Sequence, residues 1–438
     1  MVNARKLVVK LLTRMDDNNA YSNILLSDSL KRNELSQQDK KFASALFYGV
    51  VEWQYTLDEI IREFSAKKSQ RISNEIRNVL RIALYQLLYM DSVPDSAAVD
   101  ESVKLAKQSR KPNSAGFVNA LLREFIRSGK KLPTRSSSVD QRAIDYSCPV
   151  WLVKKLIREY NDRVCLDVLK TSIGQAPTTV RVNTVHAPLE DTLKMLSAEG
   201  IGYEIVKFLP DCLILHLPGS VEQTNAYKNG RIHVQDIACQ FCVAALEPKE
   251  NDIVLDMCAA PGGKTFTIAE HMKDKGTVYA FDLHENRVKL IRSGAKRLGL
   301  NCIRARANDA KEYLKDMPMA NKVLCDVPCS GLGVIRRKPE IKYKDPADFE
   351  RLPDIQKVIL DTSSKYVKRG GILVYSTCTL SREENDSVVA DFIKRHPDFA
   401  PCKLGSYFGN DRDKSRLTFT PSTYNSDGFF IAKFMRIG

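Results

Sequence analysis

Apolar residues recur every three or four positions through the first 128 residues of the chain. Phe42, Leu46 and Val50 are one example of this spacing, which places side chains on one face of a helix. Pro94 and Pro112 interrupt the pattern, and a proline ends a helix because it lacks the backbone N–H that the helix requires. The first third of the chain therefore predicts an all-α bundle of about six or seven helices.

The pattern changes after a polar segment at residues 132–139, which we interpret as a linker. Beyond it, short apolar runs that are typical of strands mix with helical spacing up to residue 245. The expected elements are helices at 149–160 and 188–200 and strands at 178–183 and 212–217. Together they predict a small α+β module over residues 145–245.

From Asp252 onward, short apolar runs alternate regularly with segments of helical spacing. This alternation is typical of a doubly wound, largely parallel sheet whose two faces are both covered by helices. The expected strands are 253–257, 278–283, 303–307, 323–327 and 372–376, and the expected helices follow Gly263 and cover 285–298, 347–368 and 383–395. The predicted domains are an all-α domain at 1–135, the α+β module at 145–245 and a Rossmann-like α/β domain at 246–438.

The charge of the chain indicates the class of partner. The net charge is +14, of which +8 falls within residues 1–135, and a strongly basic protein suits a polyanion such as nucleic acid. No apolar run approaches the roughly 20 residues of a membrane span, and the first residues do not have the pattern of a signal peptide. The eleven cysteines are odd in number and none precedes Cys148, so a reducing cytoplasm is expected rather than a secreted disulfide framework.

The loop from Asp256 to Thr265 joins the first expected strand of the α/β domain to its first helix. Its small residues, with Gly262 and Gly263, allow a ligand to lie against the backbone at the carboxyl edge of the sheet. These glycines are contiguous with Lys264, so the spacing of a phosphate-binding Walker loop is absent, and so is Gly-x-Gly-x-x-Gly. The loop therefore predicts a cofactor site of another kind.

Acidic residues stand at the ends of the next three strands. Asp282 lies 19 residues after Gly263, where a carboxylate can hold both hydroxyls of a ribose. Asn308 and Asp309 follow the third strand, where a side chain can bond an adenine amino group, and Asp326 ends the fourth. Each acid alone is more often a cap or a turn residue. Their joint placement predicts a nucleoside cofactor without phosphates rather than a dinucleotide.

Two strand ends each present a cysteine beside the same expected crevice. Cys329 lies in Asp-Val-Pro-Cys-Ser-Gly-Leu-Gly, and Cys378 lies in Tyr-Ser-Thr-Cys-Thr. A thiol becomes reactive where a cation or a helix N-terminus favours the thiolate, and otherwise it packs as a small hydrophobic group. The residues alone permit either cysteine to attack a substrate. Cys239 and Cys242 lie on a helical pattern without a second pair, so no zinc site and no redox motif is expected.

These motifs resemble those of the RNA cytosine-5 methyltransferases. The loop Asp256–Thr265, the segment Asp326–Gly331 and the strand end Ser376–Thr379 look like motifs I, IV and VI of that family. The basic helical third is similar to the NusB-like domain of one branch, RsmB, also called Sun or Fmu, and Gly230–Asp236 is similar to its lead-in to motif I. The resemblance covers nearly the whole chain. It implies a class I methyltransferase domain preceded by an all-α NusB-like RNA-binding bundle and an RRM-like α+β module.

The resemblance also implies the reaction, with S-adenosyl-L-methionine as methyl donor and a 16S rRNA cytosine of the 967 type as acceptor. It implies Cys378 as the nucleophile that bonds to C6 of the base and Cys329 as the residue that helps to release the product. Asp326, beside Cys329, is the candidate for stabilising charge at N3 of the ring. The implied cofactor contacts are Cys258, Ala259, Ala260, Pro261, Gly262, Gly263, Lys264, Asp282, Asp309 and Asp326, with Arg287 as a further candidate. A monomer without a metal and without a membrane partner is expected.

Two other functions fit parts of the sequence. A non-enzymatic RNA-binding factor would use the helical bundle alone, and failure to bind S-adenosyl-L-methionine would favour it. A nucleotide-dependent oxidoreductase is disfavoured by the missing Gly-x-Gly-x-x-Gly, and nicotinamide binding would test it. Lys338 and Tyr343 stand where many members of the resembled family have His and Trp. Arg336, Arg337, Lys338 and Lys342 either grip RNA phosphates or form a solvated basic loop.

Overall fold

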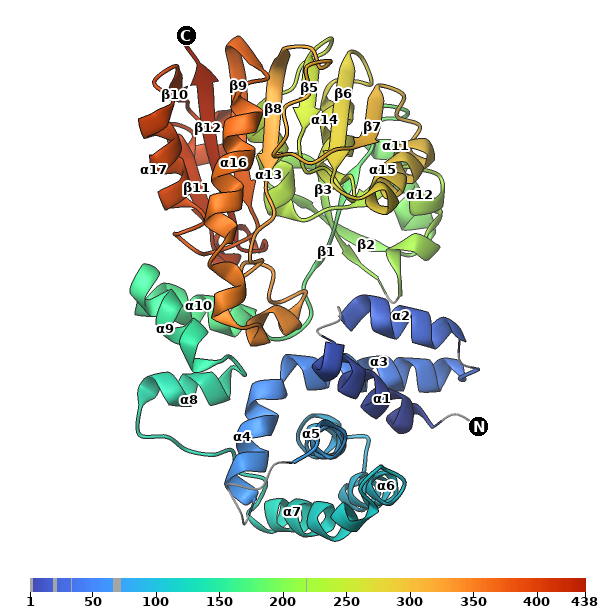
Figure 1. The fold of residues 1–438 in the computed structure, drawn as a ribbon. Coiled ribbons are helices and arrows are strands. Elements are labelled where there is room, and N and C mark those ends of the chain that lie inside the picture. Colours follow the sequence, from blue (N-terminus) through green and yellow to red (C-terminus); the bar gives the residue numbers. More distant parts are fainter. Residues whose placement is uncertain (1–2, 19–21, 33, 66–71, 218) are drawn as a thin grey trace. The chain divides into compact units, whose positions relative to one another are not determined.

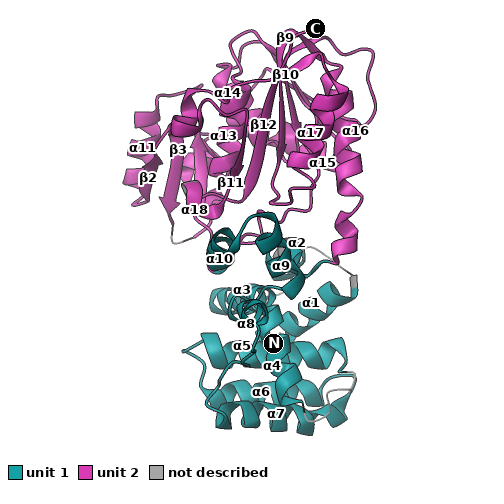
Figure 2. Cartoon of the chain, turned by 90° about the vertical axis from the view of Figure 1, so that its left-hand side faces the viewer, with its two compact units in different colours: residues 1–173, 338–344 teal, residues 174–337, 345–438 magenta. Residues whose placement is uncertain are grey.

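The computed structural model describes residues 3–18, 22–32, 34–65, 72–217 and 219–438. They form two compact units, which Figure 2 shows in different colours. The first, called the helical unit below, contains residues 1–173 and 338–344, and the second, called the sheet unit, contains residues 174–337 and 345–438. The division into three domains stays a prediction.

The helical unit confirms the predicted all-α fold of the first third. Leu46 and Val50 are fully buried with Leu80 in one hydrophobic core, as the helical spacing predicts. Pro94 caps α6 and Pro112 opens the short helix η1, so both prolines stand at helix boundaries. The elements are α1 (Ala4–Asn18), α2 (Ser22–Arg32), α3 (Gln37–Glu52), α4 (Gln54–Phe64), α5 (Asn74–Tyr89), α6 (Asp95–Lys107), η1 (Pro112–Ser114), α7 (Ala115–Arg127), α8 (Ser138–Asp145), α9 (Val150–Glu159) and α10 (Asp162–Thr171).

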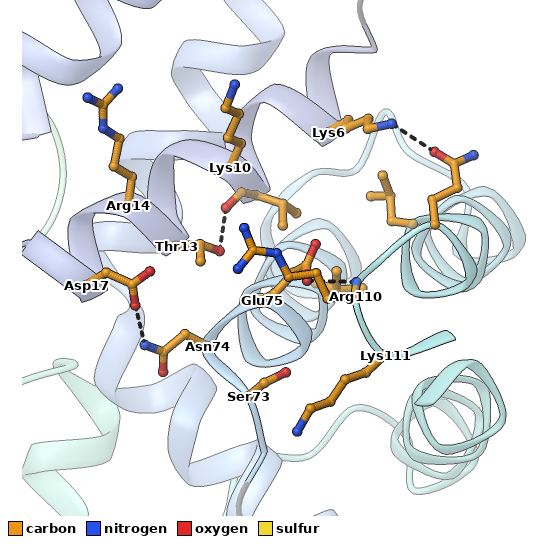
Figure 3. A pocket seen from close by; sticks show the side chains of 14 residues that line it. Lys6, Lys10, Thr13, Arg14, Asp17, Ser73, Asn74, Glu75, Arg110 and Lys111 are labelled. Atoms are coloured by element: carbon orange, nitrogen blue, oxygen red, sulfur yellow. Dashed lines mark hydrogen bonds between the residues drawn. The ribbon is translucent and has the colours of Figure 1, made fainter. Parts of the chain in front are cut away.

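A groove of about 630 Å³ lies on this unit, between α1, the start of α5 and the segment that follows α6 (Figure 3). We call it the α1 groove. Its floor is apolar and its walls carry both cations and acids. The residues that line it are Lys6, Val9, Lys10, Thr13, Arg14, Asp17, Ser73, Asn74, Glu75, Val79, Leu105, Gln108, Arg110 and Lys111.

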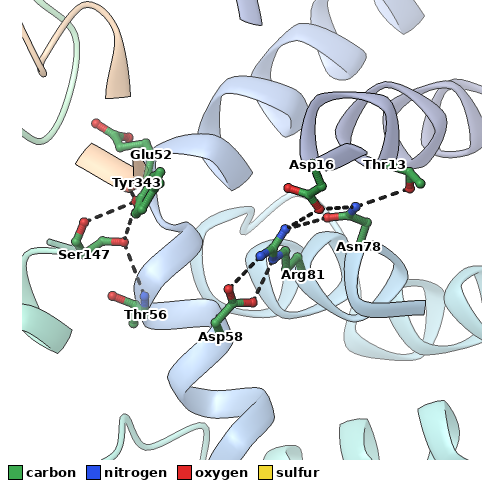
Figure 4. Close-up of polar contacts among 9 residues, drawn as sticks. All are labelled: Thr13, Asp16, Glu52, Thr56, Asp58, Asn78, Arg81, Ser147 and Tyr343. Carbon is green, nitrogen blue, oxygen red and sulfur yellow. Dashed lines mark hydrogen bonds and ion pairs between the residues drawn. The ribbon is translucent and has the colours of Figure 1, made fainter. Parts of the chain in front are cut away.

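The segment Lys338–Lys344, called the inserted segment below, belongs to the helical unit although it follows much of the sheet unit in the chain. It contains η3 (Pro339–Tyr343). The Lys342 side chain is fully buried and donates to the backbone carbonyl of Glu52 at 3.0 Å. The Tyr343 hydroxyl donates to the same carbonyl at 3.0 Å, and Figure 4 shows it beside Ser147. The segment therefore completes the packing at the end of α3.

Three of the four cations expected either to grip phosphates or to form a solvated loop make internal contacts instead. Lys342, considered as a phosphate contact, has no exposed surface, and burial lowers its pKa to about 8. Arg337 pairs with Asp236 at 3.0 Å and with Asp427 at 2.7 Å inside the sheet unit. Arg336 donates to the carbonyl of Gln175 at 2.7 Å. These three cations stabilise the fold through contacts within the protein, which the charge pattern alone did not indicate.

The sheet unit begins with a small antiparallel sheet of order β2-β3-β1-β4. Val180 and Leu213 pair across β1 and β3 and pack in its core with Leu196 of α11. The sequence predicted β1, β3 and α11, whereas β2 and β4 are additional. The elements are β1 (Thr178–Val182), α11 (Leu189–Ala198), β2 (Gly202–Val206), β3 (Leu209–His216), η2 (Val221–Gln223), α12 (Asn225–Lys228) and β4 (Ile232–Val234).

The second sheet has the order β10-β12-β9-β8-β5-β6-β7, as Figure 1 shows, and β11 pairs with β12. Strands β5 to β9 run parallel, and β12 is antiparallel to β9. The elements are α13 (Ile237–Leu246), β5 (Ile253–Asp256), α14 (Gly263–His271), β6 (Thr277–Asp282), α15 (Glu285–Leu298), β7 (Ile303–Ala307), β8 (Ala320–Asp326), η4 (Pro346–Phe349), α16 (Leu352–Ser364), β9 (Val367–Thr377), α17 (Asp386–Arg395), β10 (Phe399–Pro401), η5 (Ser406–Asp411), β11 (Arg416–Phe419), α18 (Pro421–Tyr424) and β12 (Phe429–Arg436).

Both faces of this sheet are covered, which confirms the doubly wound α/β class. Val254 packs in a core with residues of α13, α14 and α15, whereas its neighbour Leu255 packs in another with α16 and α17. Consecutive strand residues point to opposite faces, so a strand that is buried on both sides is apolar throughout. Two helices begin later than predicted: α16 starts at Leu352 instead of 347, with Pro353 in its first turn, and α17 starts at Asp386 instead of 383.

Candidate active site

The carboxyl end of β8 places Asp326 between two hydrogen-bond donors. Ser376 of the neighbouring strand β9 donates to one carboxylate oxygen at 2.7 Å, and the Lys264 ammonium lies 2.8 Å from the other. Although burial works against the charge, the Asp326 carboxylate holds the pKa of Lys264 well above its ordinary value. The two acceptor oxygens are thereby fixed in direction, which orients the acid at the end of the strand.

The two cysteines predicted to share a crevice do meet. The Sγ atoms of Cys329 and Cys378 lie 3.2 Å apart, and both side chains are partly exposed. Hydrogen bonds between the two loops keep them together: Gly333 N–H donates to the carbonyl of Cys378 at 3.0 Å, and the hydroxyls of Ser330 and Thr379 lie 2.6 Å apart. Neighbouring parallel strands end at the same edge of a sheet. The parallel pairing of β8 with β9 therefore brings both thiols to one place.

The thiol of Cys329 is held in its neutral form. Its contact with Cys378, together with burial, raises the pKa of Cys329 well above the ordinary value, and the charges of Glu384 and Asp326 act in the same direction. Burial likewise raises the pKa of Cys239 to about 12, although Lys264 acts in the opposite direction. A neutral, partly exposed thiol beside a second one can hold or move a proton.

The loop between β5 and α14 is built around a buried acid. Asp256 is 1% exposed and accepts a hydrogen bond from the Thr265 hydroxyl at 2.7 Å. Burial raises the pKa of Asp256 to about 7, although the bond from Thr265 works in the opposite direction. Gly262 precedes the helix with a φ of +114°, a conformation that side chains disfavour. The acid and the glycine fix the path of the loop that the sequence singled out.

The acids after β6 and β7 are placed differently from each other. Asp282 is 4% exposed, and Arg287 bridges it at 3.1 Å to the carbonyl of Ala260 at 2.8 Å, so the loop and the acid are joined. The Asp309 carboxylate accepts from the backbone N–H of Lys311 at 3.0 Å and lies 3.3 Å from the Lys311 ammonium, within its own turn. The backbone N–H of Asn308 donates to the carbonyl of Asp282 at 3.0 Å, which sets the two turns side by side.

Two buried polar residues near the thiols were not predicted. Glu384 is 2% exposed and accepts from the backbone N–H of Ser330 at 2.9 Å. Gln356 of α16 is fully buried and donates to the carbonyl of Pro328 at 3.0 Å. The sequence placed both on helices, where Glu and Gln are ordinary, so spacing carried no signal for them.

A substitution at Gly333 tests how tightly the loops that carry Cys329 and Cys378 pack. A Cβ on Gly333 would lie 1.9 Å from the carbonyl oxygen of Gly428 and 2.8 Å from that of Cys378. Gly333→Ala should therefore lower the free energy of unfolding by about 1–3 kcal/mol, as overpacking does, and reduce activity. Thermal unfolding measures the first effect. Gly116→Ala is the control, since a Cβ there meets nothing within 4 Å. Equal melting temperatures for both variants would contradict this packing.

Two features are absent from the described ranges. No helix there is long and apolar enough to cross a membrane. The described residues also contain no group of three or more His, Cys, Asp or Glu side chains that could hold a metal ion.

Three family models match consecutive parts of the chain. The model described as "16S rRNA methyltransferase RsmB/F" matches residues 243–435, and "NusB family" matches residues 2–127. The model described as "Methyltr_RsmF/B-like, ferredoxin-like domain" matches residues 148–222. These matches cover the parts of the chain that carry the methyltransferase-like motifs, the helices of the first third and three strands of the small antiparallel sheet, β1, β2 and β3.

Similar proteins agree with these models over the full length. The chain is 38% identical to "Probable ribosomal RNA small subunit methyltransferase B" of Bacillus subtilis (strain 168), over 99% of both chains. It is 31% identical to "Ribosomal RNA small subunit methyltransferase B" of Escherichia fergusonii, over 92% of both. The crystal structure of PH0851 shares the fold with a TM-score of 0.82 at 23% identity, over 100% of this chain and 99% of that one. The chain therefore belongs to the RsmB/F family of 16S rRNA methyltransferases.

Proposed function

We propose that the chain methylates C5 of one cytosine in 16S rRNA, at a site of the 967 type, with S-adenosyl-L-methionine as donor. The observation that carries this proposal is the pair of thiols 3.2 Å apart, with an oriented acid on the same loop as one of them. A second thiol is of no use to a transferase that acts on an already nucleophilic atom. Carbon 5 of cytosine is a poor nucleophile and requires covalent activation. The reaction would take place in the cytoplasm.

The residues at the ends of β5 and β6 fit the nucleoside of this donor. Asp282 offers buried acceptor oxygens for the ribose hydroxyls, and the next residue, Leu283, is 57% exposed and offers an apolar surface for the adenine ring. The loop Cys258–Lys264 would lie along the donor, with Asp309 at the adenine amino group and Asp326 toward the reacting end. The donor supplies a methyl group activated by a sulfonium.

Cys378 would act first. Its thiolate adds to C6 of the cytosine, and the new C6–S bond moves electron density toward C5 and N3. The ring takes up a proton at N3 from water and returns it when the product leaves, and the Asp326 carboxylate would accept a hydrogen bond from that N–H. Lys264 and Ser376 hold the carboxylate in one orientation, so little reorganisation is needed. The activated C5 then takes up the methyl group.

Cys329 would act second, because its pKa depends on Cys378. While Cys378 is a thiolate, its charge keeps Cys329 protonated. Once the Cys378 sulfur is bonded to C6, that charge is gone and Cys329 can lose its proton more easily. Cys329, or a water that it orients, then removes the proton from C5. The electron pair of that C–H bond restores the ring double bond and expels Cys378 as a thiolate.

The helical unit would contribute RNA affinity through the α1 groove. The target base must leave its stack to reach a thiol, and this opening requires a firm hold on the flanking backbone. Within the described residues, the side chains of Lys10, Arg14 and Lys111 form no hydrogen bond and no ion pair. They line a groove in which Lys6 is already tied to Gln108 at 3.2 Å. Uncommitted cations are suited to phosphates.

A triple variant tests the groove. Lys10→Ala, Arg14→Ala and Lys111→Ala together should weaken binding to 16S rRNA by about 10- to 100-fold. They should also lower the slope of log K against log salt by roughly 2–3, because each lost phosphate contact releases about one ion less. Filter binding at several salt concentrations measures both. The control removes the same charge elsewhere on the unit, at Lys31, Lys41 and Lys170, which lie outside the groove. Equal losses in both triple variants would contradict a specific role.

The proposed function as a whole is tested by mapping 5-methylcytosine in a strain that lacks the gene. We expect one cytosine of 16S rRNA to lose its methyl group, and the purified protein to restore it on unmodified rRNA. Loss in transfer RNA with 16S rRNA unchanged would refute the assignment. Calorimetry with S-adenosyl-L-methionine separately tests the donor, and absence of binding would favour a non-enzymatic RNA-binding factor.

A further inference from the structure

Glu384 is a buried carboxylate beside the thiol pair, in the turn between β9 and α17. Its Oε2 atom accepts from the backbone N–H of Ser330 at 2.9 Å and from Nε2 of Gln356 at 2.9 Å. In the described part of the chain, no lysine, arginine or histidine forms an ion pair with it. A buried charge that is compensated only by neutral donors costs stability. A role beyond folding would explain why the charge is kept.

The two donors of Glu384 lie on either side of Cys329. Ser330 is the next residue, and Gln356 also donates to the carbonyl of Pro328, the preceding residue, at 3.0 Å. The backbone of Glu384 is itself anchored, because the Tyr375 hydroxyl donates to its carbonyl at 2.6 Å. One carboxylate oxygen therefore fixes the peptide group after Cys329 directly and the one before it through Gln356.

Cys378 is held by different contacts. The carbonyl of Thr379, its neighbour, accepts from Nδ2 of Asn385 at 2.9 Å, and Oδ1 of Asn385 accepts from the Thr377 hydroxyl at 2.6 Å. The Glu384 carboxylate reaches this side through the Thr379 hydroxyl at 3.5 Å, the outer limit of a hydrogen bond. The bond from Gly333 N–H to the Cys378 carbonyl does not involve Glu384. Loss of the Glu384 carboxylate should therefore displace Cys329 and leave Cys378 close to its place.

We propose that Glu384 is a positioning residue that sets Cys329 against Cys378 for release of the methylated product. This inference rests on the proposed function, since it assumes the covalent adduct on Cys378. The negative charge of Glu384 also affects Cys329, in addition to the hydrogen bonds that position it. It is one of the groups that raise the pKa of Cys329 and so keep its proton until Cys378 is consumed.

The test compares Glu384→Ala and Glu384→Gln with Glu383→Ala, a change of the adjacent exposed glutamate. With a 16S rRNA transcript, Glu384→Ala should lengthen the life of the protein–RNA adduct and lower kcat by about 10- to 100-fold, as a misplaced catalytic group does. The KM for RNA and the Kd for S-adenosyl-L-methionine should stay within about twofold, because the residues proposed to hold the donor and the RNA phosphates form no hydrogen bond with Glu384 in the described structure. Glu384→Gln should recover part of the release rate, since its amide oxygen can accept from Ser330. Glu383→Ala should match the wild type.

The outcomes separate this inference from the proposed function. Release at the wild-type rate in Glu384→Ala would overturn the inference. So would a joint fall of kcat, cofactor binding and melting temperature that Glu384→Gln does not relieve, because that pattern marks a purely structural role. If the wild type forms no adduct and no 5-methylcytosine, the proposed function fails first. If the wild type methylates and Cys329→Ala traps the adduct while Glu384→Ala does not, only the role of Glu384 fails.

Discussion

Cys378→Ala is expected to abolish both methylation of 16S rRNA and covalent capture of the RNA. Without the thiolate no C6–S bond forms, so C5 is not activated, and the rate should fall by roughly 10⁴-fold or more. Denaturing gels of protein with RNA show the adduct, and transfer of a labelled methyl group shows the reaction. Binding of S-adenosyl-L-methionine should persist, since the β5–α14 loop and Asp282 do not depend on this side chain.

The control for this variant is Cys402→Ala, because Cys402 is also a free and partly exposed cysteine but follows β10, which β12 separates from β9 in the sheet. It should keep wild-type activity and adduct formation. If Cys378→Ala retained the adduct and Cys329→Ala lost it, the roles of the two cysteines would be reversed. Both thiols are partly exposed at the ends of neighbouring strands, so their positions alone allow either one to attack.

Cys329→Ala is expected to trap the protein on its RNA. Cys378 can still attack and the methyl group can still be transferred, but the proton on C5 then has no nearby acceptor. Multiple turnover should fall by about 10²- to 10⁴-fold, the usual contribution of a positioned acid or base. A stable adduct that contains one methyl group per protein is the expected product, measured by gel and by mass spectrometry of the digested complex.

A small exogenous base supplies a control for this interpretation. Imidazole added to the trapped Cys329→Ala complex should release methylated RNA in proportion to its concentration. Release at the wild-type rate without any added base would show that water alone suffices and would remove the proposed role of Cys329. Recovery of unmethylated RNA would show that the block precedes methyl transfer.

The β–α rhythm was predictable because its physical cause is local in the sequence. Strands that are buried on both faces are continuously apolar, and Val254 and Leu255 fill different cores for that reason. β4 has only three residues, and β2 is largely exposed, so neither leaves a clear pattern. The late start of α16 follows from Pro353, which is favoured in a first helical turn and which periodicity alone does not weigh.

The site residues at the ends of neighbouring strands were predictable. Those held by side chains that are distant in the sequence were not. Cys329 and Cys378 meet because β8 and β9 are neighbours, and Asp326 shares that edge. Glu384 finds its partner 54 positions earlier, at Ser330, so no local spacing reveals it. Lys342 was considered for RNA and is buried, because its partner is the Glu52 carbonyl 290 positions away.

The inserted segment has a consequence for how the chain is made. Glu52 ends α3 near the start of the chain, yet its carbonyl is satisfied by Lys342 and Tyr343. A nascent polypeptide emerges from its N-terminus, and early domains generally fold while later ones are still being synthesised. Here the Glu52 carbonyl at the end of α3 lacks these two partners until the inserted segment has left the ribosome. Completion of the helical unit is thus a late event in synthesis, after β5 to β8 have already emerged.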